Sequence, residues 1–181
     1  MCELMLDLET GDKSCNARVY QVALVSLEKS NIVGVHGPKF VFNQYISTDE
    51  KGTEDPETMA WWRSQGVAWE RLQEELKTGL PLRETVKSFL GWWEQINSQD
   101  QVTRLWSYGA SFDIPIWQMA IERAGFKKPW DYRIERCLRT ADDLLFEGLQ
   151  HDAMADAVNQ ADRLTYKLNR RRNGMDRIHK P

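Results

Sequence analysis

Acidic side chains and one histidine are the residues of this sequence whose types and spacing could support catalysis. Asp7 lies in the apolar stretch 2–8, and Glu9 follows that stretch directly. Side chains at positions i and i+2 of a strand point to the same face, about 6.6 Å apart along it. Two buried carboxylates repel each other, and Mg²⁺ or Mn²⁺ would relieve both this repulsion and the cost of burial. The pair therefore predicts a metal site, unless the strand is an edge strand whose acids simply meet water.

Asp113 and the pair His151 and Asp156 supply further carboxylates and a candidate base. Asp113 follows an expected strand and a turn at Gly109. Open α/β sheets keep their sites at the carboxyl ends of strands, although an Asp in a first helical turn also favours the helix dipole without any function. Five residues on a helix correspond to a rotation of about 140°. His151 and Asp156 would reach one cleft only if His151 lies in the loop before the helix; otherwise His151 is a structural or exposed residue.

The elements that would position these residues follow the order of an α/β fold. Strands are expected over residues 2–8, 18–28 and 39–46, and they favour a three-stranded antiparallel meander. Helices are expected at about 56–64, 67–77 and 81–97, a strand at 103–107, and further helices at 112–124, 139–147 and 151–172. The sheet would therefore be mixed.

Local signals predict several helix ends. Asp55 precedes Pro56, which is the order of an N-cap and a first helical residue. Ser111 is expected to cap the helix at 112–124, and Gly125 is expected to end it. These ends place Asp113 in the first turn of its helix.

Length and composition limit the class of protein. A chain of 181 residues suits one domain, and 41% hydrophobic with 28% charged residues excludes wholesale disorder. Three cysteines without CxxC spacing are expected to be reduced cytosolic thiols. The sequence shows no signal peptide and no apolar run that could span a membrane, so we expect a soluble, cytoplasmic protein without a membrane partner. It also shows no Walker loop and no GxGxxG pattern, which argues against a nucleotide kinase or a dinucleotide enzyme.

Charge is distributed unevenly along the chain. The formal net charge is -3, yet residues 163–181 carry seven Lys or Arg and one acid, whereas residues 1–162 carry seventeen bases and twenty-six acids. We expect a single domain over 1–181 with a basic C-terminal helical tail at about 163–181. The tail would either grip phosphates through Arg170, Arg171 and Arg172 or form a solubilising helix end, since cations favour helix C-termini.

The joint order of these signals resembles the DEDDh 3′→5′ exonuclease superfamily, the DnaQ-like nucleases on a ribonuclease-H-like fold. The matching stretches are Leu6 to Thr10 (LDLET), Tyr108 to Asp113 (YGASFD) and His151 to Asp156 (HDAMAD), and Cys137 to Thr140 (CLRT) is similar to an Arg-Thr stretch that often precedes the third motif. The resemblance spans roughly residues 3–165. It is strongest to the compact exoribonuclease-like and phage or prophage exonuclease branch, because Met59 to Trp62 (MAWW) follows an acidic loop. The resemblance implies a mixed sheet with three antiparallel N-terminal strands and flanking helices.

The resemblance also implies an activity, a metal-dependent 3′→5′ exonuclease acting on the free 3′ end of single-stranded RNA or DNA. In this superfamily two divalent ions, Mg²⁺ or Mn²⁺, take part in phosphodiester hydrolysis. By resemblance, Asp7, Glu9 and Asp156 would hold one ion. Asp7 would bridge to the second ion near Asp113, and His151 would accept a proton from the attacking water. Two cations about 3.5–4 Å apart suit an in-line displacement, and an imidazole with a pKa of about 6.5 suits a base at neutral pH.

Aromatic residues are the candidates for holding the substrate, because single strands are held by stacking and by positive grooves. Adjacent helical residues lie about 100° apart, so one residue of the pair Trp61 and Trp62 is expected to be buried and the other exposed. Trp61 or Trp62 is the expected nucleotide platform, with core packing as the alternative for either. Phe112 is expected to touch the terminal base, and the resemblance adds Thr10 to the substrate contacts.

Two other functions stay open from the residues. A non-catalytic nucleic-acid-binding or polymerase-partner module on the same fold is the alternative, although the full set of catalytic residues counts against it. A metal-dependent hydrolase of small phosphoesters or short oligonucleotides would differ only in its dependence on substrate length. The resemblance also allows a homodimer. The residues do not distinguish ribose from deoxyribose, because the contacts to a 2′-OH cannot be placed from the sequence.

Overall fold

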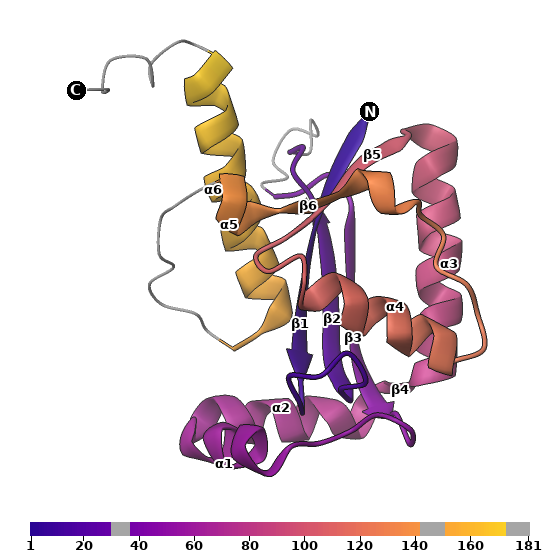
Figure 1. Cartoon of the computed structure of the whole chain (residues 1–181), viewed down its shortest axis with the longest axis vertical. Coiled ribbons are helices and arrows are strands. Elements are labelled where there is room, and N and C mark those ends of the chain that lie inside the picture. Colours follow the sequence, from indigo (N-terminus) through magenta and orange to yellow (C-terminus); the bar gives the residue numbers. More distant parts are fainter. Residues whose placement is uncertain (30–36, 142–150, 173–181) are drawn as a thin grey trace.

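The computed structural model describes residues 1–29, 37–141 and 151–172, and for residues 141 and 170–172 it describes the backbone alone. Within these residues, a six-stranded mixed sheet carries helices on both faces and at one end (Figure 1). The strands are β1 (Cys2–Thr10), β2 (Val19–Ser26), β3 (Val41–Thr48), β4 (Leu80–Pro81), β5 (Val102–Ser107) and β6 (Glu135–Cys137). The helices are α1 (Pro56–Ser64), α2 (Val67–Thr78), α3 (Leu82–Gln99), α4 (Asp113–Arg123), α5 (Leu138–Ala141) and α6 (Ala153–Arg172), with a 3-10 turn at Tyr132–Ile134. None of these described helices is long and apolar enough to cross a membrane.

β1 lies inside the sheet, whose strand order is β4-β3-β2-β1-β5-β6. It pairs antiparallel with β2, and β2 pairs antiparallel with β3, so the expected meander and the mixed α/β sheet are confirmed. On its other side β1 pairs in parallel with β5, which pairs in parallel with β6. β1 is therefore an inner strand, but its pairing with β5 ends at Leu6, so Asp7 and Glu9 lie where β1 extends beyond β5 and pair with β2 alone.

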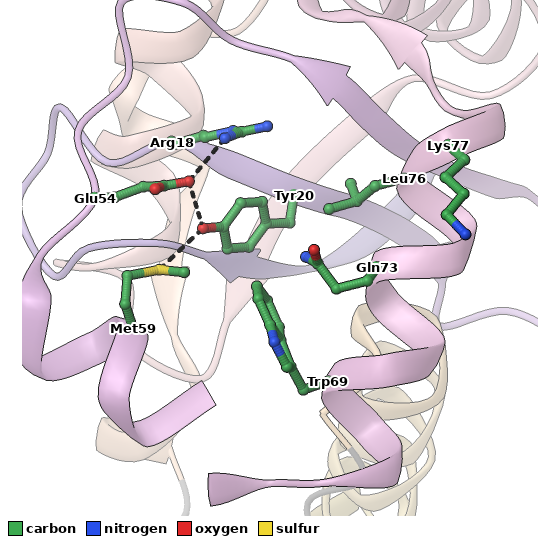
Figure 2. A pocket seen from close by; sticks show the side chains of 8 residues that line it. All are labelled: Arg18, Tyr20, Glu54, Met59, Trp69, Gln73, Leu76 and Lys77. Carbon is green, nitrogen blue, oxygen red and sulfur yellow. Dashed lines mark hydrogen bonds and ion pairs between the residues drawn. The ribbon is translucent and has the colours of Figure 1, made fainter. Parts of the chain in front are cut away.

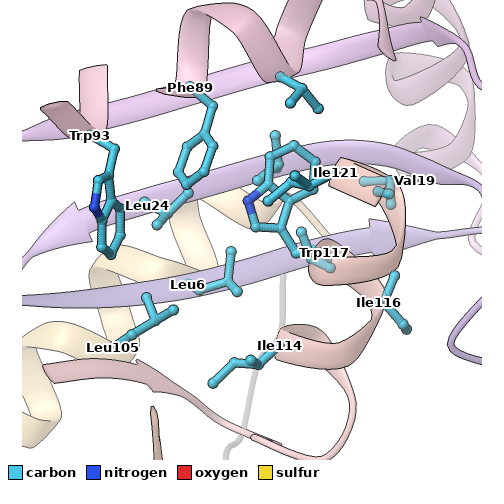
Figure 3. Close-up of a cluster of buried hydrophobic side chains, with 14 of the residues drawn as sticks. Leu6, Val19, Leu24, Phe89, Trp93, Leu105, Ile114, Ile116, Trp117 and Ile121 are labelled. Atoms are coloured by element: carbon cyan, nitrogen blue, oxygen red, sulfur yellow. The ribbon is translucent and has the colours of Figure 1, made fainter. Parts of the chain in front are cut away.

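The two faces of the sheet bury different apolar layers. Leucine side chains of β1, Leu6 among them, pack with Phe89 of α3 and Trp117 of α4 (Figure 3). On the opposite face, Met5 packs with Ala157 of α6. Alternation along β1 therefore sends its leucines to the α3 and α4 side and leaves its two acids on the side covered by α6, as the sequence predicted.

A buried polar contact attaches the start of α6 to the sheet. Gln21 of β2 is 1% exposed, and its Oε1 accepts a hydrogen bond of 3.0 Å from the backbone N–H of Ala153, the first residue of α6. The Nε2 of Gln21 donates to Oδ1 of Asn43 on β3 at 2.9 Å. Both ends of this amide are therefore paired. The contact sets where α6 begins on the sheet, and Asp156 follows in the first turn of that helix.

The helix starts were predicted correctly at α1 and incorrectly at α4. Oδ2 of Asp55 accepts from the N–H of Thr58 at 2.8 Å, so the expected N-cap is confirmed. The cap predicted at Ser111 is wrong, because α4 begins at Asp113 without a side-chain cap. The carbonyl of Gly109 accepts from the N–H of Asp113 at 3.1 Å instead. A backbone turn, and not a serine hydroxyl, starts this helix.

Other boundaries differ slightly from the prediction. Gly125 follows α4 with φ +86°, a conformation that glycine adopts without strain, so the predicted helix end is confirmed. The third strand begins at Val41, and the last helix begins at Ala153. Two short strands, β4 and β6, were missed because they have too few residues to show a periodic pattern. Three predicted features lie outside the described residues: the helix over 142–147, the side chains of 170–172, and the tail over 173–181.

Replacing Gln21 by Met should destabilise the fold by about 1–3 kcal/mol, because a buried N–H at the start of α6 loses its acceptor. The free energy of unfolding, measured by urea denaturation, tests this expectation. Gln95→Met, at an exposed position of α3, is the matched control and should change stability by less than about 0.5 kcal/mol. Equal stability of the two variants would contradict the anchoring role of Gln21.

Candidate active site

Three carboxylates from two elements converge beside the centre of the sheet. Asp7 and Glu9 extend from β1, and Asp156 extends from the first turn of α6. One oxygen atom from each lies within 4.8 Å of the other two. Glu9 is 8% exposed and Asp156 is 4% exposed. The alternation of β1 and the docking of α6 thus bring together residues that are about 150 positions apart in the sequence.

Asp113 and His151 complete the set of five residues predicted from the sequence. All five line one cavity of about 310 Å³, together with Leu8, Tyr108, Gly109, Ser111, Phe112, Arg139 and Gln160. Asp113 is the first residue of α4, shortly after the end of β5, which pairs with β1. His151 lies before α6 with φ 51°, outside the helix. The spacing of His151 and Asp156 allowed them to share a cleft only if His151 lies in the loop before the helix. The structure places His151 in that loop.

Burial and mutual repulsion raise the pKa values of the acids. For Asp7, burial is the larger cause and the charges of Asp113 and Glu9 add to it, so its pKa lies well above the usual range. Burial followed by the charge of Asp156 does the same to the pKa of Glu9. Burial raises the pKa of Asp113 to about 7, although hydrogen bonds and the charge of Arg139 oppose the change. Without a cation, the cluster is therefore a poor place for several negative charges at neutral pH.

The donor set fits a hard divalent cation. Carboxylate oxygens are the ligands that Mg²⁺ and Mn²⁺ prefer, and three of them lie close enough to share one ion. The same desolvation that disfavours isolated charges strengthens attraction to a cation. Asp7, Glu9 and Asp156 are therefore the residues that would hold the metal, with Asp113 beside them in the same cavity.

A second cavity of about 390 Å³ adjoins the first and shares Leu8, Glu9 and Phe112 with it. Its lining includes Thr10 and Trp61, two of the predicted substrate contacts. Trp61 is 43% exposed, and its ring lies 4.7 Å from the His151 ring in an edge-on arrangement. The cavity thus offers an aromatic wall and an acidic rim next to the carboxylate cluster.

Trp62 also lines this cavity but is 1% exposed. Its Nε1 donates to the carbonyl of Thr10 at 2.8 Å, which ties α1 to the end of β1. The tryptophan pair therefore has one buried and one exposed member, as the helical spacing predicted. Of the two, Trp61 has the open ring face that stacking on a base requires.

A third cavity, of about 380 Å³, lies between α1 and α2 (Figure 2). The hydroxyl of Tyr20 donates to Glu54 at 2.8 Å and lies 3.2 Å from the sulfur of Met59, while Arg18 pairs with Glu54 at 2.7 Å. These groups point toward one another in Figure 2 and bond among themselves. The cluster therefore supports α1, and through it the tryptophan pair, from the side away from the acids.

Gln160 is a site residue that the sequence interpretation missed. It is 1% exposed, lines the cavity of the acids, and donates from Nε2 to Oδ1 of Asp7 at 2.7 Å. Its Oε1 is buried without a hydrogen-bond partner among the described residues. The signal was present in the sequence, because Gln160 follows Asp156 by four residues and so lies on the same helix face. Gln160 fixes one oxygen of Asp7 and leaves the other for a cation.

The mixed α/β sheet with its flanking helices is a ribonuclease-H-like fold, and nucleases are among the solved structures that share it. Solved structures with a similar fold include cell-death related nuclease 4 (CRN-4), with TM-score 0.53, 17% identity, and coverage of 93% of this chain and 64% of that chain. The nuclease domain of 3'hExo, a DEDDh family member bound to rAMP, has TM-score 0.61 and 10% identity over 93% of this chain and 92% of that chain. The RNase domain of the yeast Pop2 protein has TM-score 0.50 and 11% identity over 93% of this chain and 76% of that chain. This chain thus spans less than two thirds of CRN-4.

The chain belongs to the family of the 3'-5' exoribonuclease Rv2179c-like domain, whose family model matches residues 2–168. No curated protein matches the chain in sequence. The family model describes a 3'-5' exoribonuclease domain, and the solved structures of similar fold are nucleases. The family resemblance and fold class predicted from the sequence are confirmed by these findings.

The metal-free protein should lose stability as the pH rises from about 5 to about 8. The pKa values of Asp7, Glu9 and Asp113 are raised in the folded state. Between the ordinary pKa of an acid, about 4, and its raised value, the folded protein therefore binds more protons than the unfolded protein. The free energy of unfolding falls as the pH rises through this range. Thermal melting at both pH values in EDTA tests this sign. Asp7→Asn should flatten the dependence, and added Mn²⁺ should stabilise the native protein more at pH 8 than at pH 5. An increase in stability with pH in EDTA would contradict the assignment.

Replacing Gln160 by Ala should weaken Mn²⁺ binding by about 10- to 100-fold, because Asp7 loses the donor that orients it. Isothermal titration calorimetry with Mn²⁺ measures this without any substrate. Asn159→Ala, at the exposed neighbouring position of α6, is the matched control and should bind Mn²⁺ like the native protein. Unchanged affinity in the Gln160 variant would remove this residue from the support of the metal site.

Proposed function

We propose that this exonuclease removes nucleotides from the free 3′ end of single-stranded RNA, with two divalent cations and His151 as the general base. The observation that carries the proposal is the convergence of three carboxylates, with oxygens within 4.8 Å, in the same cavity as Asp113 and His151. Three acids around one point suit one cation. A fourth acid in the same cavity supplies a ligand toward a second cation.

The proposed roles follow the position of each side chain. Asp7, Glu9 and Asp156 would hold one cation, and Asp7 would share a second with Asp113. When bound, the cations would stabilise the charge that develops on the attacking and leaving oxygens of the phosphodiester. The side chains of the protein would orient the attacking and leaving oxygens and move the proton of the attacking water.

His151 is proposed to take a proton from the attacking water. Its ring packs edge-on against Trp61, at 4.7 Å between centroids, and lies 6.0 Å from the ring of Trp62. These contacts limit the rotation of the imidazole and hold it over the cavity. His151 would accept the proton of this water, and the cations, when bound, would make the water more acidic.

The neighbouring cavity is proposed to hold the terminal nucleotide. Trp61 and Phe112 offer apolar surfaces to the base, and Thr10 lines the same cavity. Single strands suit this arrangement because an unpaired base can leave the stack and lie against an aromatic ring. RNA is proposed as the substrate because the family is described as a 3'-5' exoribonuclease.

We also propose that residues 1–181 act as one domain, and that Mg²⁺ or Mn²⁺ is the cation. The alternative, a non-catalytic nucleic-acid-binding module on this fold, would keep the acids without turnover. A homodimer is an expectation from the resemblance that gel filtration with light scattering would test.

Incubating the purified protein with 5′-labelled single strands of one sequence, as RNA and as DNA, tests the function. We expect a ladder that shortens from the 3′ end with Mn²⁺ or Mg²⁺, is lost in EDTA, and is faster on RNA. Asp156→Ala should lose activity by at least about 100-fold, whereas Asp162→Ala, at an exposed position of the same helix, should not. Intact strands in every lane, together with clear binding, would favour the non-catalytic module.

The His151→Ala variant distinguishes a role of His151 as general base from a role in metal binding. Turnover should fall by about 100- to 10,000-fold, because general base catalysis contributes that much, while Mn²⁺ affinity measured by calorimetry should stay within about two-fold. Loss of Mn²⁺ binding in this variant would mean that His151 supports the metal site and is not the base.

A further inference from the structure

Arg139 is a cation at the edge of the acidic cavity that none of the roles above uses. It lies in α5, directly after β6 (Figure 1), and it lines the cavity with the five predicted catalytic residues. Its guanidinium lies over the ring of Tyr108 at 4.4 Å from the centroid. Its charge lowers the pKa of Asp113, although burial outweighs this effect. Arg139 is therefore an exposed cation that stacks on Tyr108 beside the acids.

The stacking contact leaves the binding edge of the guanidinium open. A guanidinium that stacks on an aromatic ring uses its face, so the N–H donors in its plane remain able to form hydrogen bonds. Among the described residues, no carboxylate forms an ion pair with Arg139. Several other arginines are engaged: Arg123 pairs with the buried Asp49 at 2.5 Å, and Arg104 pairs with Glu3 at 2.7 Å. Arg139 thus combines a stacked position with donors that no carboxylate among the described residues occupies.

A nucleic acid strand brings the group that matches these donors. Phosphate oxygens accept two parallel N–H bonds from an arginine, and such charge-assisted pairs are shorter and stronger than neutral ones. Acids that bind metals repel any phosphate whose charge the metals do not neutralise. A positively charged side chain at the edge of the cavity is needed to offset this repulsion. Arg139 meets this need from the protein itself.

We propose that Arg139 binds the non-bridging oxygens of a phosphate at the 3′ end of the substrate, with Tyr108 as the residue that positions its guanidinium. The inference rests on the proposed function and names a substrate contact within the same site. The phosphate is either that of the scissile bond or that of the linkage before it. The chemistry is the same for both, and substrate length separates them.

Binding of short RNA tests the proposal without turnover. In a His151→Ala background with Mn²⁺, Arg139→Gln should weaken binding of a 5′-labelled RNA trinucleotide by about 10- to 100-fold, measured by fluorescence anisotropy. The slope of log affinity against log salt concentration should become shallower by about 0.7, the loss of one phosphate contact on a single strand. Arg139→Lys should recover part of the affinity, because it restores the charge and not the stacked planar fork.

Arg133→Gln is the matched control. Arg133 makes the same kind of contact with Tyr132, at 5.6 Å from the ring centroid, but its side chain is 77% exposed and it does not line the cavity. This variant should bind RNA like the parent. Equal weakening by the Arg133 and Arg139 variants, or no weakening by either, would overturn the proposal.

Substrate length then identifies the phosphate. If Arg139→Gln weakens binding of a dinucleotide as well as a trinucleotide, the contact is to the scissile phosphate; if only the trinucleotide is affected, the contact is to the linkage before it. Either result supports the contact. Should native protein shorten no strand while Arg139→Gln still weakens binding selectively, the exonuclease mechanism falls and the phosphate site stands.

Discussion

The rest of the structure depends on one electrostatic constraint, the gathering of three buried carboxylates and the half-buried Asp7 around a single cavity. Burial and mutual repulsion raise the pKa values of Asp7, Glu9 and Asp113. Such a cluster costs free energy in the metal-free fold, and the remaining structure must be stable enough to bear that cost. Two of these acids, Asp7 and Glu9, lie at the end of an inner strand that pairs with β2 and has a leucine layer beneath it. A cation would convert the same cluster from a source of instability into a binding site, so metal binding is expected to stabilise the fold.

Two glutamines and one tryptophan hold the elements that carry the site residues in place relative to one another. Gln21 sets the start of α6, and Gln160 on that helix contacts Asp7. Trp62 bonds to the carbonyl of Thr10 at the end of β1 while its ring packs beside His151. The contacts of Gln21 and Trp62 are buried and that of Gln160 is partly buried, and each holds one element against another where the acids meet. The relative positions of β1, α1 and α6 are thus determined by directional contacts and not by apolar packing alone, which tolerates small displacements.

Most of the fold and the five central residues could be predicted from the sequence, because their signals are local or follow a fixed order. The leucine alternation of β1 predicted the strand and its face, and Asp55 with Pro56 predicted the start of α1. Contacts between distant segments could not be predicted. Gln160 had a visible spacing to Asp156, but its partner on β1 depends on how α6 docks on the sheet. Short elements such as β6 are stabilised by the neighbouring strand and show no pattern of their own.

The local arrangement of charge explains how a chain with a net charge of -3 can accept a polyanion. Many of its bases are used in ion pairs, such as Arg18 with Glu54 and Arg71 with Asp152, and do not contribute to a positive surface. Attraction for a phosphate must then come from cations held at the acidic cluster and from bases at its edge. A cation that neutralises the acids removes their repulsion of the strand, and by linkage the strand must raise the affinity for that cation by the same factor. Metal and nucleic acid are therefore expected to bind cooperatively. Net charge alone is a poor guide to the substrate of such a protein.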